Sequence, residues 1–328
     1  MGDARMLRST VASVLRRLFQ ACLVVIGATF LLSLLLRLLP VGLEDLYVVG
    51  ATEAERAAFV RELRLDRDPL TYYLLWLGDF VRGDLGWYVQ GGGLSEPVGN
   101  RLAGALPVSL QLILYTQIVS ILASVPLGVF TALRVGRRSD RVLSYGLFTA
   151  SSIPNFVFGL LMASFFGVTL AWFPPLGYVS PTENLLEHVK SMTLPVLSLS
   201  IPLIATYTRL LRTDVIATLR EDYVTMAISK GLSTRQILFS HVLRPSSVTL
   251  FTSFALNMGA LIGGTIVIEQ VFTIPGIGQE IGIAIFSRQF FALQSYVALI
   301  AVGFIFFNTL ADVLVGFVDP RTRERRHA

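Results

Sequence analysis

Six stretches without a charged residue dominate this sequence, and each is long enough to cross a membrane. They cover residues 18–36, 102–133, 142–182, 191–208, 245–268 and 289–311. A helix needs about 20 apolar residues to span a hydrocarbon core of ~30 Å. Hydrophobic residues make up 53% of the chain and charged residues only 15%, too few to cover the surface of a soluble domain. We therefore expect an all-α, polytopic membrane protein with six transmembrane helices.

Two of the stretches allow a second interpretation. Residues 142–182 could hold two spans, but their end, AWFPPLGYVSP, is rich in proline and aromatic residues, which is typical of a chain leaving the membrane. We expect one helix there. Residues 18–36 resemble the apolar part of a signal peptide, but the stretch is too long and no small-x-small cleavage site follows it. We expect it to remain a helix.

The basic residues predict the orientation. Eighteen of the 27 lysines and arginines fall in four segments, residues 5–17, 134–141, 209–244 and 321–326. By the positive-inside rule these segments are cytoplasmic, as are both termini. The net charge of +5 is then a topology signal and does not indicate nucleic-acid binding. The predicted organisation is residues 1–40, the N-terminus and first helix; 41–101, an extracytoplasmic helical segment; 102–318, a five-helix core with a cytoplasmic loop at 209–244; and 319–328, a basic cytoplasmic tail.

The extracytoplasmic segment is longer than a simple connection. Thr52 and Glu55 have the spacing of a capping box before an apolar pattern of helical period. Farther along, tyrosines and tryptophans alternate with glycines. We interpret the segment as a small helical cap at the membrane surface, with a docking or gating surface for an external partner as the alternative.

Few residues suit catalysis or ion coupling. His188, His241 and His327 fall in different predicted loops and the tail, so no metal site or Ser/His relay is expected. Two acids lie near span ends, Glu269 and Asp312, where snorkelling or a neighbouring donor such as Asn308 would satisfy them. No phosphate-binding loop surrounds either lysine. If the chain transports a solute with ATP, a separate ATPase must supply the energy.

The cytoplasmic loop 209–244 has the pattern of helix, break and helix. We expect a first helix with one apolar side, a stop at Lys230-Gly231 where glycine takes the left-handed conformation, and a second helix capped by Ser233 and limited by Pro245. The two stripes comprise Val215, Leu219, Tyr223, Met226 and Ala227, then Ile237, Leu238, His241 and Val242. Such a pair of helices forms a rigid protrusion suited to a partner's groove.

The segment DYVTMAISKGLSTRQILFSHVLRP, residues 222–245, resembles the cytoplasmic coupling motif of ABC importer permeases of the dipeptide, oligopeptide and nickel branch. The resemblance implies ATPase-coupling roles for Tyr223, Thr225, Met226, Ala227, Lys230, Gly231, Leu232, Ser233, His241, Leu243 and Arg244. Thr225 and Met226 depart from the Glu-Ala of the broader importer motif. Residues 76–88, 262–278 and 312–321 are also similar to family segments, and the first permease of such a pair is the closer match.

The resemblance implies the type I importer permease fold in a bacterial inner membrane, with alternating access as the mechanism. The implied partners are a second permease, two cytoplasmic ATPases that hold ATP and Mg, an extracytoplasmic binding protein and the lipid bilayer. The chain itself is expected to bind no cofactor and to be a transport subunit rather than an enzyme.

Span five carries the candidate pore and outer-loop residues. Small and polar residues recur at helical spacing and include a Gly-x-x-x-Gly pair, which suits either pore lining or helix packing: Ser253, Asn257, Gly259, Gly263 and Gly264. An outer gate or loop is predicted at Glu269, Phe272, Pro275, Gly276 and Gly278, turning at Pro275-Gly276 into a short helix. Pro154, Pro195 and Pro202 are candidate kinks.

Two questions stay open from the sequence. Dipeptides, longer peptides, nickel chelates and haem are all compatible with this branch as cargo. A membrane scaffold or sensor that binds an ATPase without transporting is the alternative function.

Overall fold

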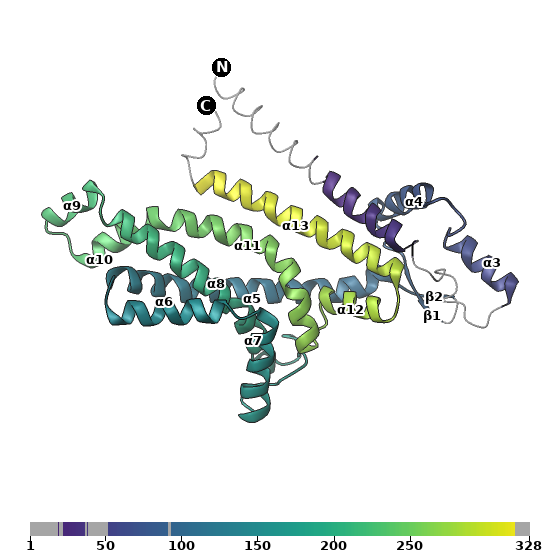
Figure 1. Ribbon diagram of the computed structural model, residues 1–328, viewed down its shortest axis with the longest axis horizontal. Coiled ribbons are helices and arrows are strands. Elements are labelled where there is room, and N and C mark those ends of the chain that lie inside the picture. The colour runs from purple at the N-terminus through teal and green to yellow at the C-terminus, as the bar shows by residue number, and fades with distance from the viewer. Residues whose placement is uncertain (1–18, 20–21, 37, 39–51, 91–92, 319–328) are drawn as a thin grey trace, which may run out of the picture. The chain divides into compact units, whose positions relative to one another are not determined.

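The structure is a computed structural model that describes residues 19, 22–36, 38, 52–90 and 93–318, except for the side chains of 312–318. The described chain is mostly helical (Figure 1). It divides into two units, residues 1–108 with 275–305 and residues 109–274 with 306–328. Each unit is described below by itself.

The helices and strands follow in chain order. After a helix over Cys22–Leu36 come α3 (Glu53–Glu62), α4 (Pro69–Val81), β1 (Trp87–Gln90), β2 (Gly93–Pro97), α5 (Val98–Leu133), α6 (Arg138–Ser151), α7 (Asn155–Met162), the π-helix η1 (Ala163–Thr169), α8 (Leu185–Thr218), α9 (Asp222–Ser229), α10 (Thr234–Gln236), the π-helix η2 (Ile237–Val242), α11 (Leu243–Phe272), α12 (Ile277–Phe286) and α13 (Phe290–Val318).

Within the described residues, four helices are long and apolar enough to cross a membrane. They are Val98–Leu133, Leu185–Thr218, Thr234–Phe272 and Phe290–Ala311, and a bent pair of helices would make a fifth. These four contain four of the six predicted spans. The first predicted span is represented by the shorter helix Cys22–Leu36. The predicted cytoplasmic termini lie outside the described residues.

The third predicted span is not a single helix. α6 and the α7–η1 helix are bent by 101° at a short break, so the prediction of one helix is wrong. Pro154 explains the break, because it lacks an N–H and disfavours a helical residue before it. α6 accordingly ends at Ser151, and α7 begins just after Pro154. The irregular segment that follows, residues 171–181, agrees with the predicted exit from the membrane.

α8 forms the centre of the second unit. It contacts α6, α7 and α11 (Figure 1). Tyr207, Leu211 and Val215 on α8 are completely buried, and Leu211 lies so close to Gly128 of α5 that a Cβ added there would be 3.0 Å from the Leu211 Cβ. The absence of a side chain on Gly128 therefore permits the close approach of α5 and α8.

The first unit contains the described part of the segment that was predicted to be extracytoplasmic. The predicted capping box is confirmed, since the Glu55 N–H donates to Thr52 Oγ1 at 3.3 Å and the Thr52 N–H donates to Glu55 Oε2 at 2.8 Å. The all-helical prediction for 41–101 is wrong at β1 and β2, which pair as an antiparallel hairpin. Trp87, Tyr88 and Val89 favour a strand because aromatic and β-branched side chains suit a pleated surface.

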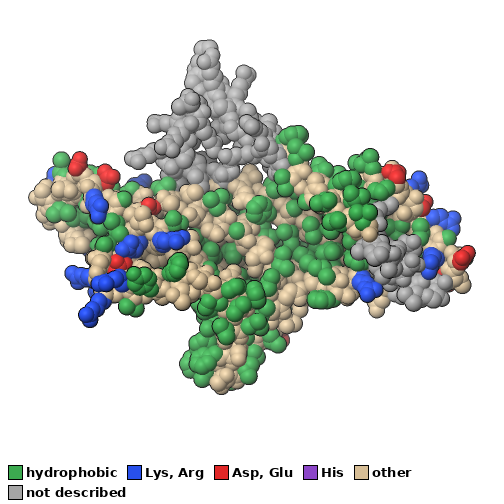
Figure 2. Space-filling model, in the orientation of Figure 1, with side chains coloured by type: hydrophobic (Ala, Val, Ile, Leu, Met, Phe, Trp, Pro, Cys, Tyr) green, Lys and Arg blue, Asp and Glu red, His purple; other side chains and the backbone are tan. Residues whose placement is uncertain are grey.

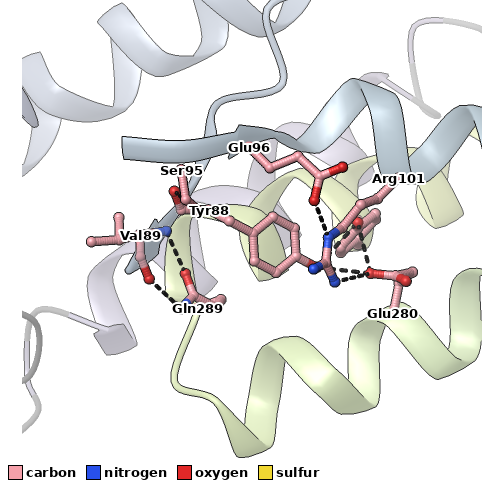
Figure 3. A network of polar contacts seen from close by, with 8 residues as sticks. Tyr88, Val89, Ser95, Glu96, Arg101, Glu280 and Gln289 are labelled. Carbon is pink, nitrogen blue, oxygen red and sulfur yellow. Dashed lines mark hydrogen bonds and ion pairs between the residues drawn. The ribbon is translucent and has the colours of Figure 1, made fainter. Parts of the chain in front are cut away.

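A network of polar contacts joins the hairpin to α5 and α12 (Figure 3). The Arg101 guanidinium contacts Glu96 at 2.8 Å and Glu280 at 3.2 Å, and it lies 4.3 Å from the centre of the Tyr88 ring. The Tyr88 hydroxyl donates to Glu280 at 3.0 Å. Burial raises the pKa of Tyr88 to about 12, so its hydroxyl stays protonated and can donate at physiological pH.

The outer edge of β1 is occupied by a side chain. The Val89 N–H donates to Gln289 Oε1 at 2.8 Å, and Gln289 Nε2 donates to the Val89 carbonyl at 2.7 Å (Figure 3). The primary amide of Gln289 thus makes the two bonds that a neighbouring strand would make.

Candidate coupling site

The path of the helices through residues 209–244 differs from the prediction in its first half. α8 continues past the predicted span to Thr218, and α9 begins at Asp222 after a turn. Val215 therefore lies on α8 and Tyr223 on α9. The predicted stripe, which placed both residues on one helix, is wrong. Glu221 adopts an extended conformation at the start of α9, and the acidic residue after it is favourable at a helix N-terminus.

The predicted break at Lys230-Gly231 is confirmed. Gly231 has a φ of +78°, its N–H donates to the Ile228 carbonyl at 2.9 Å, and the Leu232 N–H donates to the Ala227 carbonyl at 3.3 Å. Glycine adopts this left-handed conformation without the penalty that a Cβ brings. The turn therefore depends on Gly231 for its backbone conformation.

The predicted cap at Ser233 is also confirmed. The Gln236 N–H donates to Ser233 Oγ at 3.4 Å, and the Ser233 N–H donates to Gln236 Oε1 at 3.2 Å. These two bonds form a capping box that starts α10. Each side of the glycine turn is thus fixed by local hydrogen bonds.

Pro245 does not end the second helix, contrary to the prediction. α10, η2 and α11 form one helix from Thr234 to Phe272. In the π-helix η2 the Leu243 N–H donates to the Leu238 carbonyl, five residues back, and Pro245 follows in the first turn of α11, where a proline is tolerated. The carbonyl of His241, which Pro245 cannot bond, accepts a hydrogen bond from the Tyr223 hydroxyl at 3.3 Å.

Residues 222–242, here termed the coupling knob, have a buried and an exposed side. Val224, Ala227, Ile237 and Val242 pack with α8 and α11 in one hydrophobic cluster. The other residues predicted to couple to an ATPase are exposed or half-buried, and Met226 is 59% exposed. The knob thus presents Met226 and other apolar side chains, Tyr223, Ile228 and Phe239, that the described part of the chain does not cover. Uncovered apolar side chains on a rigid protrusion suit binding to another protein.

The glycines predicted to line a pore or to pack differ from one another. Gly259 is buried, and a Cβ added there would lie 3.0 Å from Asn308 Oδ1 on α13. Gly263 is exposed and would place its Cβ in open space, while Gly264 meets only Leu261 of its own helix at 4.0 Å. Within the described residues, Gly259 is therefore a packing glycine and Gly263 is not.

The polar candidates of span five are half-buried. Ser253 and Asn257 lie one helical turn apart, and Asn257 Nδ2 donates to the Ser253 carbonyl at 2.8 Å. The Asn257 amide thus makes one of its hydrogen bonds within its own helix, and its side chain also bonds Tyr207 on α8.

The predicted outer loop contains one buried carboxylate. Glu269 is completely buried and accepts a hydrogen bond from Ser109 Oγ at 2.7 Å. A neighbouring donor, here Ser109, thus contacts the Glu269 carboxylate, and the alternative expectation of snorkelling is wrong because the side chain is buried. The side chain of Asp312, the other acid of that prediction, lies outside the described residues.

The predicted turn after span five is confirmed. Phe272 is buried, its carbonyl accepts a bond from the Gly177 N–H at 2.8 Å, and α11 ends at Thr273 in the left-handed conformation. Pro275 and Gly276 follow, and Gly278 lies in the first turn of α12.

Comparisons with known proteins identify the family. Residues 124–324, more than half of the chain, match the family described as binding-protein-dependent transport system inner membrane component. The chain belongs to this family. It is 31% identical to the oligopeptide transport system permease protein AppB of Bacillus subtilis, in a match that covers 94% of this chain and 98% of AppB. It is 32% identical to the probable peptide ABC transporter permease protein y4tP of Sinorhizobium fredii, and this match covers 94% of this chain and 98% of y4tP.

Solved structures agree with this family in fold. The permease resembles, over 69% of its length, the whole of a chain in inward-facing conformations of the MetNI methionine ABC transporter, with a TM-score of 0.56 and 16% identity. The predicted type I importer permease fold is thus confirmed, and the permease is a multi-pass protein of the bacterial inner membrane.

The permease has buried polar contacts that sequence reasoning missed. The Tyr207 hydroxyl donates to Gln117 Oε1 at 3.0 Å, and Gln117 Nε2 donates to the Phe254 carbonyl at 3.3 Å. These contacts connect α8, α5 and α11. Gln117 and Tyr207 are uncharged and belong to no recognisable motif, so the sequence holds no signal that marks them.

A second missed contact lies at the predicted cytoplasmic end of α8. Arg212 Nε and Nη2 contact the two carboxylate oxygens of Asp140 at 3.0 and 2.9 Å. Asp140 also accepts bonds from the Gly136 N–H and the Ser144 hydroxyl. This bidentate pair fixes the start of α6 on α8. The available signal was the position of Asp140 as the one acid within an arginine-rich turn.

Proposed function

We propose that this permease forms half of the translocation pore of an ATP-driven, binding-protein-dependent importer of peptides. The family description and the names of its relatives support this class of cargo. The proposed assembly contains a second related permease, for which this chain is the first of the pair, two cytoplasmic ATPases that bind ATP and Mg, and an extracytoplasmic binding protein.

The observation that carries the proposal is the construction of the coupling knob. Its inner side is held by the hydrophobic cluster, its turn by Gly231 and its cap by Ser233. On its outer side, Tyr223, Met226 and other apolar side chains are exposed in the part of the chain that the structure describes. A rigid protrusion with an apolar outer side fits a groove on an ATPase, in the way that an amphipathic helix fits a hydrophobic groove.

The connection of the knob to the membrane supports a role in alternating access. α8 leads into the knob without interruption up to Thr218, and the helix from Thr234 to Phe272 leads directly out of it. A displacement of the knob by ATPase closure therefore reaches two predicted spans through continuous helices. In this proposal the spans respond by opening the pore to one side of the membrane at a time.

Purification of the chain with its native partners tests the proposal. The importer predicts that a second permease and ATPases co-purify, and that ATP hydrolysis rises when a peptide-loaded binding protein is added. Nickel chelate and haem, loaded in place of peptide, should give no stimulation. A preparation without any ATPase, or one whose hydrolysis ignores loaded binding protein, would contradict the importer and favour a scaffold.

A further inference from the structure

The turn between α5 and α6 is strongly basic and open to solvent. Arg134, Arg137, Arg138 and Arg141 lie within eight residues, and all four are exposed. Figure 2 shows lysine and arginine side chains gathered over this end of α6. The Arg134 guanidinium lies 4.2 Å from the centre of the Phe130 ring on the last turn of α5. We call residues 134–141 the arginine turn.

Among the residues that the structure describes, no carboxylate is available to neutralise the arginine turn. Asp140 is its one acidic residue. Asp140 is only 4% exposed, and both of its oxygens are bound by Arg212. In the part of the chain that the structure describes, no other carboxylate pairs with Arg137, Arg138 or Arg141. Within the described residues, the positive charge of these arginines is therefore not neutralised.

An exposed apolar stripe begins at the arginines and runs along α6. Val142, Tyr145 and Phe148 are 71%, 68% and 65% exposed. They follow Arg138 and Arg141 at helical steps of three and four, so the five side chains share one face. The other face of α6 carries Asp140 and contacts α8. One face of α6 therefore presents cations at its start and apolar groups along the rest.

The dimensions of this face match one leaflet of a bilayer. Ten residues separate Arg138 from Phe148, which is ~15 Å along a helix. Half of a hydrocarbon core of ~30 Å is also ~15 Å. α5 is an apolar helix long enough to cross the membrane, and it ends at Leu133, directly before the charged residues of the arginine turn; charged side chains favour the membrane surface over the hydrocarbon.

We propose that the arginine turn binds the phosphate of an anionic phospholipid, with an acyl chain against Val142, Tyr145 and Phe148. Guanidinium groups bind phosphate oxygens in a bidentate manner. Clusters of basic residues next to a membrane-crossing helix attract anionic lipids. The proposal depends on the membrane location of the permease and not on its cargo, so it stands or falls separately from peptide import.

The test measures lipid binding to the purified permease in detergent. Dioctanoyl phosphatidylglycerol is titrated and counted by native mass spectrometry, with dioctanoyl phosphatidylcholine as the neutral comparison. The triple variant Arg137→Gln, Arg138→Gln and Arg141→Gln should bind phosphatidylglycerol roughly 100-fold more weakly, from about 1 kcal/mol for each basic residue. Binding of phosphatidylcholine should not change.

A matched control separates a site from general charge attraction. The variant Arg321→Gln, Arg323→Gln and Arg325→Gln removes three charges from the basic tail and should bind phosphatidylglycerol as the natural permease does. The variant Phe148→Ser keeps every charge and should weaken binding several-fold. The proposal would be overturned if the arginine-turn triple variant bound phosphatidylglycerol as tightly as the natural permease does. It would also be overturned if the tail control weakened phosphatidylglycerol binding as much as the arginine-turn variant. Circular dichroism identifies a triple variant that does not fold, and the Phe148 variant then decides.

Discussion

The hydroxyl of Tyr223 donates to the carbonyl oxygen of His241, the carbonyl that Pro245 leaves without its helical donor. Tyr223 lies on α9 and His241 lies in η2, on opposite sides of the glycine turn. The bond thus joins the two arms of the coupling knob at their base. It also explains why a proline is tolerated in a helix that runs on into the membrane.

This relationship predicts a specific interaction between two substitutions. Tyr223→Phe should lower the free energy of unfolding by about 1 kcal/mol, the usual net value of a hydrogen bond. In a Pro245→Ala background the alanine N–H can bond the His241 carbonyl, so Tyr223→Phe should cost much less. Unfolding by denaturant of the four proteins measures this difference. Equal losses in both backgrounds would show that the hydroxyl does not replace the missing N–H.

Substitutions at Gly231 should act through backbone conformation rather than through crowding. A Cβ at this position meets nothing within 4 Å, but φ is +78°. Gly231→Val should therefore strain the turn by about 1–2 kcal/mol and reduce peptide uptake, while the permease still inserts in the membrane.

The matched variant at this position is Gly231→Asn. Asparagine tolerates the left-handed conformation better than a β-branched residue does, so this variant should retain most uptake. Uptake into vesicles compares the two, and similar uptake by both would contradict the conformational argument.

The two glycines of span five should respond differently to alanine. Gly259→Ala places a methyl group 3.0 Å from Asn308 Oδ1, whereas Gly263→Ala meets nothing within 4 Å. We expect Gly259→Ala to lower the free energy of unfolding by about 1–3 kcal/mol, because the added methyl group overpacks the contact with Asn308. Gly263→Ala should leave the stability of the isolated chain unchanged. If Gly263 faces the pore or the second permease, its alanine variant will change uptake or assembly without a change in stability.

Tyr88 should make the first unit sensitive to alkaline pH. Burial raises its pKa to about 12 in the folded protein, compared with about 10 in an unfolded chain. Its contribution to stability is therefore complete below pH 10 and is lost as the pH rises toward 12. Tyr88→Phe removes this titration, so the difference in stability between the natural protein and the variant should shrink over that range. Thermal unfolding at several pH values between 9 and 12 measures it, and a constant difference would refute the assignment.

Local signals predicted local structure well. The capping boxes at Thr52 and Ser233 and the turn at Gly231 depend on residues within a few positions, so their chemistry is visible in the sequence. The sequence predicts a kink at Pro154 but not the bend of 101°, because the angle depends on how α6 and α7 pack against α8.

Distant partners explain the remaining errors. The carboxylate of Glu269 accepts a hydrogen bond from Ser109, 160 positions away, and Pro245 is accommodated by a hydroxyl from another helix. Neither partner is marked by spacing in the sequence. Asp140 is the single acid among the arginines of its turn, which could have marked it as the partner of a basic residue. The positive-inside rule uses only the total charge of the turn, so it does not single out Asp140.

The amide of Gln289 has a consequence for how the hairpin of β1 and β2 binds other molecules. Because it occupies both the N–H and the carbonyl of Val89, an extended peptide cannot add to β1 there as a further strand without first displacing it. The same feature protects the isolated protein, since open strand edges are where chains join and aggregate. A protein or peptide that binds this hairpin at Val89 must therefore recognise side chains, because both backbone polar groups of Val89 are already hydrogen-bonded.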